Sequence, residues 1–219
     1  MLFAILNHSS YKDIPVTAIA AACQKQLVTH YATGWRRMAS TVRVVTDPKS
    51  LVPGTCPVVL LDNADQAGAL GYHDVTPAGL PYSKIFVKTI MENGGTYIHG
   101  PDSLSVTISH EILETVEDPY AWWWSDAPDG RQYALELCDP VEADCYDIGG
   151  VSVSNFVLPA YFSSAAGPYD YLKKLAKPFT MTAGGYLIVR DPGGQATQIF
   201  GDAYQEWKKP TKQRILKRA

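Results

Sequence analysis

The chain has 219 residues, of which 46% are hydrophobic and 19% are charged, so it can bury a sizeable core as one large domain or two small ones. No apolar run approaches the ~20 residues of a membrane-spanning helix, so we expect no membrane partner. The four cysteines are too few and too scattered for a disulfide scaffold, and we expect buried free thiols.

The net charge of −3 is unevenly distributed. Of the 19 basic and 22 acidic residues, six basic and one acidic lie in the tail 204–219, which leaves 13 basic and 21 acidic residues in 1–203. Binding to nucleic acid needs a broad basic surface, so an acidic body makes a nucleic-acid partner unlikely. We therefore expect the basic tail to be a solvated terminal helix.

The first half of the chain alternates strands and helices. The opening "MLFAILNHSS" has no basic segment and no cleavage site, so we interpret it as a strand instead of a signal peptide. We therefore expect the protein in the cytoplasm of the producing cell or packed into a virion there. Residues 14–33 carry apolar side chains at helical spacing. Strands are predicted at 41–47 and at 57–63, where a continuous apolar run is typical of a strand buried on both faces.

The next segments surround the most informative motif. "GALGYHDV" and "SKIFVKTI" (68–75 and 83–90) flank a turn-rich connector and predict an extended or hairpin pair. A helix is then predicted from Asp102 or Ser103, either of which can cap it, to residue 117, with Pro119 ending it.

Beyond residue 118 we expect a loop at 120–133, a strand within 149–162 and a hairpin around "DPGG". The predicted fold class is α+β: a mixed β-sheet backed by helices, with a motif-bearing helix and an irregular carboxy-terminal half.

The motif is "SHEILETVEDP", residues 109–119. On a helix, residues i and i+4 share a face, so His110 and Glu114 can grip one cation while Glu111 lies beside it. In zinc peptidases the position of Glu111 supplies the general base, and the position of Glu114 is a histidine. Zinc accepts carboxylate oxygen as well as imidazole nitrogen, so Glu114 is a permissible ligand. The plainer interpretation is a solvated helix face.

Two ligands do not complete a metal site. The segment "YALELCDPVEADCYD" follows the motif and is rich in carboxylates. Glu136 and Asp139 lie 26 and 29 residues beyond His110, and either could return as the third ligand or orient the histidine through its second ring nitrogen.

Four ordered blocks together resemble an uncharacterised family common in bacteriophages and prophages. They are "GALGYHDVTPAGLPYSKIFVKT", "SHEILETVEDP", "YALELCDPVE" and "VSNFVLPAYF". The likeness covers roughly residues 55–165 and extends, more distantly, to secreted plant exordium-like proteins. Both groups look like relatives of the zincin metallopeptidases, whose first subdomain runs in the same order of strands and helices.

The resemblance implies a zincin-like site. His110 would match the first zinc ligand and Glu111 the general base, with Glu136 or Asp139 as the returning ligand. Glu114 departs from the family's second histidine, and a site of three oxygens and one nitrogen would also accept Mn²⁺ or Ca²⁺ in place of Zn²⁺. The implied domain is single and zincin-like, 1–219, with a sheet and helix part at 1–118, a return segment and hairpin at 119–203, and the basic tail at 204–219.

Three further features fall near this site. His73 either faces the cleft from an edge strand, where an extended peptide could pair, or is structural, which is commoner. Trp122–Trp124 could form an aromatic wall, although three adjacent tryptophans cannot all face one way. Tyr161 could stabilise an oxyanion.

The sequence thus predicts a protein that binds a divalent metal and, if catalytic, hydrolyses a peptide or amide bond. The alternative is a non-catalytic virion or assembly protein that retains a structural metal site, with partner proteins in the virion in place of a peptide substrate.

Overall fold

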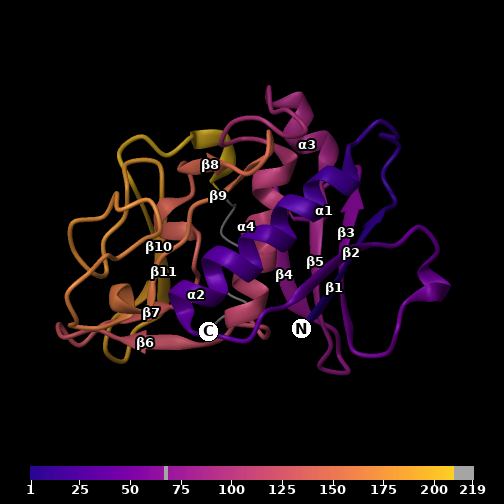
Figure 1. Ribbon diagram of the computed structural model, residues 1–219. Helices are drawn as coiled ribbons and strands as arrows, with labels where there is room; N and C mark the ends of the chain where they lie inside the picture. Colours follow the sequence, from indigo (N-terminus) through magenta and orange to yellow (C-terminus); the bar gives the residue numbers. More distant parts are fainter. Residues whose placement is uncertain (67–68, 210–219) are drawn as a thin grey trace.

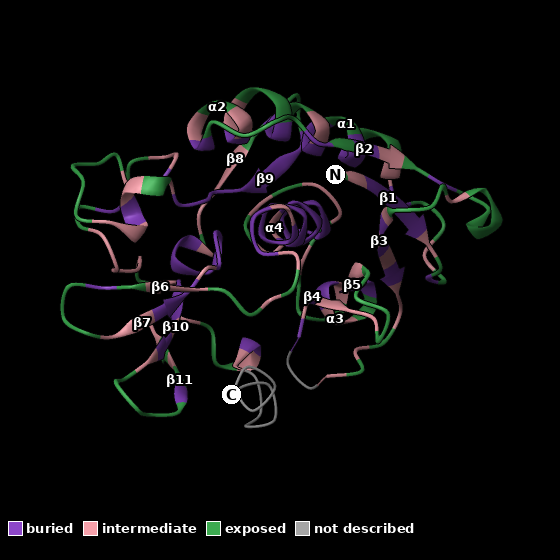
Figure 2. Ribbon diagram, turned by 90° about the horizontal axis from the view of Figure 1, so that it is seen from below, coloured by how far each residue is buried: buried purple, intermediate pink, exposed green. Residues whose placement is uncertain are grey.

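The computed structural model describes residues 1–66 and 69–209. A five-stranded sheet and a four-stranded sheet lie on opposite sides of one long helix, α4 (Leu104–Glu117) (Figure 1). Viewed along its axis, α4 is enclosed by other elements and is buried over most of its length (Figure 2). The expected α+β class with a mixed sheet is confirmed.

The five-stranded sheet has the order β2-β1-β3-β5-β4. Its strands are β1 (Leu2–Asn7), β2 (Thr41–Val44), β3 (Thr55–Leu61), β4 (Gly71–Val75) and β5 (Pro81–Phe86). All neighbours pair in parallel except β4, which runs antiparallel to β5 at the edge. The strands predicted at 41–47 and 57–63 are therefore confirmed, and the predicted pair is present as β4 and β5, although β5 is shorter than expected.

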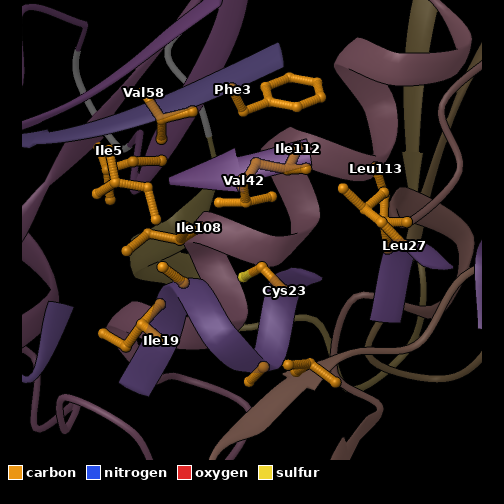
Figure 3. Close-up of a cluster of buried hydrophobic side chains, with 14 of the residues drawn as sticks. Phe3, Ile5, Ile19, Cys23, Leu27, Val42, Val58, Ile108, Ile112 and Leu113 are labelled. Carbon is orange, nitrogen blue, oxygen red and sulfur yellow. The ribbon is translucent and has the colours of Figure 1, made fainter. Parts of the chain in front are cut away.

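The alternation of side chains along a strand decides which face of this sheet carries the main core. Phe3 and Ile5 of β1 are fully buried against the helices, together with Val58 of β3 (Figure 3). Ala4 and Leu6 point to the other face, where they join a small cluster. The helices are therefore packed on the face with the larger side chains.

The helical segment predicted at 14–33 is present with a change of pitch. Helix α1 (Val16–Lys25), a π-helical segment (Gln26–Tyr31) and α2 (Ala32–Trp35) follow one another without a break. The strand predicted at 83–90 is wrong in its second half, because β5 ends at Phe86 and α3 (Val87–Glu92) begins at the next residue. Val87 and Ile90 are buried one helical turn apart, a spacing that puts them on one face of a helix but on opposite faces of a strand.

Helix α4 is fixed at both ends. Ser103, not Asp102, is the N-cap, and its hydroxyl accepts a hydrogen bond from Val106 N at 3.3 Å. At the other end, Glu117 accepts a hydrogen bond from Tyr31 Oη at 2.6 Å and pairs with Arg37. The interpretation of the motif as a solvated face is wrong, since every glutamate of α4 is buried.

The carboxy-terminal half is more regular than predicted. Its main sheet has the order β11-β10-β7-β6, formed by β6 (Trp124–Asp126), β7 (Gln132–Ala134), β10 (Tyr186–Arg190) and β11 (Ala196–Phe200). A separate pair joins β8 (Cys145–Asp147) to β9 (Ser152–Ser154). The strand within 149–162 and the hairpin around "DPGG" are confirmed, but the loop expected at 120–133 is instead the β6–β7 hairpin.

Most of the predicted tail helix lies outside the described residues, which end at Lys209. Of the part that is described, Lys208 is buried and pairs with Asp102 at 2.5 Å and Glu142 at 3.6 Å, so it is not solvated. Among the described helices, none has both the length and the apolar character required to cross a bilayer.

Ile108→Ala should lower the free energy of unfolding by about 2–5 kcal/mol, because Ile108 is fully buried between α4 and the sheet (Figure 3) and its truncation leaves a cavity. Urea denaturation followed by circular dichroism measures this. Val28→Ala, at a side chain 43% exposed on the helical segment, is the matched control and should stay within about 0.5 kcal/mol of wild type. Equal losses for both variants would contradict the assigned core.

Candidate metal centre

The two motif ligands lie together, as their spacing predicts. His110 Nε2 is 3.2 Å from Glu114 Oε2, one turn apart on α4. Their side chains are 12% and 4% exposed, so the pair lies beneath the surface. A buried carboxylate facing an imidazole at this distance is suited to hold either a proton or a metal ion between them.

The return segment brings both predicted acidic residues to this pair. Asp139 Oδ1 lies 3.2 Å from His110 Nε2, and Glu136 is buried two residues beyond β7. The backbone N–H of Cys138 donates to Glu114 Oε1 at 3.2 Å, which ties the segment to α4. The return segment also packs closely against Gly185, where a Cβ would lie 2.3 Å from Pro140 O, so only glycine fits there without a shift.

His73 joins the site from the edge strand β4. Its Nδ1 lies 3.3 Å from Glu111 Oε2 and 3.7 Å from Glu114 Oε2. Its Nε2 is 3.1 Å from the carbonyl oxygen of Asp118 and 3.9 Å from Glu136 Oε2. From the sequence, His73 could either face the cleft or be structural. Strand alternation could have decided this, because Tyr72 packs on one face of β4 and the next residue points to the other face.

Burial and proximity shift the pKa values of the motif pair in opposite directions. Burial disfavours charge on both groups, but each stabilises the charge of the other. The net result is a pKa for His110 well above its usual value and a pKa for Glu114 lowered to about 2.

Asp139 behaves differently. Burial raises its pKa and the negative charge of Glu114 raises it further, to about 7, despite the opposing effect of His110. The site therefore holds several buried carboxyl groups close together, an environment in which a divalent cation would stabilise their charged forms.

Ligand atoms close enough to share an ion form two groups within the described residues. One contains His110, Glu114 and Cys138, and the other contains His73, Glu114 and Glu136. Asp139 adjoins the first group through His110. Cys138 is a potential ligand for which we expected only a buried free thiol. The structure has it free and buried, and burial raises the pKa of its thiol. Of the other cysteines, Cys145 is free but only partly buried.

The site opens into a cleft of about 280 Å³ between the two sheets. His73, Glu114, Glu136 and Asp139 form part of its lining. The opposite wall comes from β10 and β11, and the rim includes Tyr120 and Trp122. Glu111 lies on a smaller cavity of about 40 Å³ that it shares with His110, large enough for a water molecule.

Two other predicted features, the aromatic wall and the oxyanion-stabilising tyrosine, differ in outcome. Trp122 lines the cleft and is 60% exposed, while Trp124 belongs to β6, so only part of the aromatic run faces the site. Tyr161 is not available to an oxyanion in the cleft, because it is buried and its hydroxyl donates to Thr180 O at 2.8 Å.

Comparison with known proteins adds no assignment: no family model, no curated protein and no solved structure matches the chain.

Proposed function

We propose that this protein binds a divalent metal ion through His110, Glu114 and Asp139 and is a zincin-like hydrolase of peptide or amide bonds. The observation that carries the proposal is the buried cluster of imidazole and carboxylate groups around His110 and Glu114, of which Glu114 and Asp139 line the 280 Å³ cleft. Nitrogen and oxygen donors in this combination suit Zn²⁺, and the oxygen-rich set also suits Mn²⁺ or Ca²⁺.

The arrangement of the sheet supports the zincin-like part of the proposal. An antiparallel edge strand, β4, lies over the helix that carries the motif, and the acidic ligand returns from the following segment. Within the described residues β4 pairs on one side only, with β5. An extended peptide could add to its outer edge by backbone hydrogen bonds, and the cleft residues Tyr72 to Val75 would lie beside it.

The chain's own residues have distinct roles in this proposal. A bound divalent ion supplies Lewis acidity, which polarises the scissile carbonyl and makes water more acidic. Glu111 faces the small cavity beside His110, where it can take a proton from the attacking water and return it to the leaving nitrogen. His73 lies beside that carboxylate, with Nδ1 3.3 Å from Glu111 Oε2. Trp122 offers apolar surface to a substrate side chain.

The test uses full-length protein purified without chelators. Elemental analysis should find divalent metal, and a broad peptide library should be cleaved by the metal-loaded protein, with cleavage lost after dialysis against a chelator and restored by the metal. A folded, metal-free protein that gains no melting temperature from zinc or manganese would refute the site. Metal without cleavage would favour the alternative of a structural metal site in a virion or assembly protein.

A further inference from the structure

Glu114 occupies an unusual position in the cluster, because it belongs to both groups of ligand atoms. Its Oε2 lies 3.2 Å from His110 Nε2 and 3.7 Å from His73 Nδ1. Two donors bound to one ion through bonds of about 2.1 Å lie about 3.3 Å apart, so each histidine is placed to share an ion with this oxygen. A carboxylate within reach of two histidines that fall in separate ligand groups is suited to bridge two ions.

The two histidines come from different elements and line different cavities. His73 comes from β4 and lines the large cleft with Glu136. His110 comes from α4 and lines the small cavity with Glu111. Within the described residues the two imidazoles fall in separate ligand groups. The separation favours two ion positions over one ion held by both rings.

The orientation of His73 gives a second, independent observation. The carbonyl oxygen of Asp118 is 3.1 Å from His73 Nε2 and can only accept, so in the neutral ring Nε2 carries the proton. The lone pair of Nδ1 then faces the carboxylates of Glu111 and Glu114. A backbone carbonyl that fixes the ring in this way is the usual outer partner of a metal-binding histidine.

Asp139 provides a third observation. Its side chain is 4% exposed and lines the large cleft, and within the described residues its Oδ1 accepts no hydrogen bond of good geometry, although His110 Nε2 is 3.2 Å away. A buried carboxylate oxygen in this state is costly without a cation. It completes the His110 group as a ligand.

Charge points the same way. In the described part of the chain, the ion pairs of three carboxylates are with the two histidines alone: Glu111, Glu114 and Asp139. Each of the two imidazoles therefore has carboxylate oxygens within 4 Å that can serve as ligands to an ion beside it.

We propose that the cluster binds two divalent ions bridged by Glu114. His110 and Asp139 complete one position, and His73 and Glu136 complete the other. The inference rests on the proposed function in placing metal in this pocket and goes beyond it in the number of ions. The His73 position lies on the large cleft, and the His110 position lies on the small cavity that Glu111 also lines. Ions about 3.5–4 Å apart are the arrangement that two-metal hydrolases use.

The experiment is metal titration of the full chain. Protein stripped with a chelator is titrated with Mn²⁺ alone and with Zn²⁺ alone by calorimetry, and bound metal is checked by elemental analysis. Wild type should bind about two ions per chain. His73→Ala and His110→Ala should each bind about one, and Glu114→Ala should lose tight binding at both positions. His99→Ala, at an exposed histidine away from the cluster, is the matched control and should bind as wild type does.

A measurement on wild type covers the case in which a variant fails to fold. Electron paramagnetic resonance of the Mn²⁺-loaded protein should show the exchange-coupled spectrum of a bridged pair and not that of isolated ions. One ion per chain with an isolated-ion spectrum would overturn the second position and leave the proposed function intact. No bound metal would overturn both.

Discussion

Glu111→Gln is expected to lower peptide hydrolysis by ~10²-fold or more while leaving the bound metal and the fold nearly unchanged. Glutamine has the same shape as glutamate but cannot accept the proton of the attacking water. Glu111 borders the small cavity beside His110, and its side chain is 5% exposed, so bulk water cannot easily replace it as the base. The measurement is the cleavage rate of the best library peptide, with metal content and melting temperature determined for each sample.

Glu92→Gln is the matched control, because Glu92 is an exposed glutamate on α3 outside the cleft. It should cleave at the wild-type rate. Activity that survives in Glu111→Gln would refute the mechanism outright. If neither wild type nor variant cleaves any peptide while both retain metal, the non-catalytic virion or assembly role becomes the better interpretation.

Removal of metal is expected to lower the free energy of unfolding by several kcal/mol. A ligand that binds only the folded state at about 1,000 times its Kd adds about 4 kcal/mol to the free energy of unfolding. For a chain of this size the loss corresponds to a fall in melting temperature of about 10 °C. The physical reason is the buried set of carboxylates, which repel one another and are poorly solvated without a cation. Differential scanning calorimetry with and without a chelator measures it.

The variants separate metal stabilisation from other effects of a chelator. His110→Ala should reduce the gain in melting temperature on adding metal, because the position that it completes with Asp139 is lost. His99→Ala should show the full gain. An equal gain in both variants would mean that metal binds elsewhere and would remove His110 from the site.

The motif itself could be predicted from sequence because its geometry is local. Helical periodicity alone places His110 and Glu114 on one face, and the structure has their side chains 3.2 Å apart. The first strands were predictable for the same reason, since their apolar runs match a period of two or a fully buried strand. Local signals also gave the cap region of α4, with only the choice between Asp102 and Ser103 left open.

The sequence could not decide what surrounds the motif. A helix with several glutamates is usually solvated, and only the packing of α4 between two sheets makes these glutamates buried (Figure 2). Likewise, the segment 120–133 has the composition of a loop, and it becomes the β6–β7 hairpin because β10 supplies a neighbouring strand. Strand formation in such short segments depends on partners that are distant in the chain.

The sequence by itself determined which residues could bind a cation, because ligand chemistry and helical spacing are properties of the local chain. Only the tertiary structure decided which of them meet. Glu136 and Asp139 were equivalent as return ligands in the sequence, but the structure places Asp139 against His110 and Glu136 near His73. His73 is 37 residues from His110 in the sequence and reaches Glu114 only because β4 pairs antiparallel to β5 over α4. That pairing is a long-range contact, and no local periodicity encodes it.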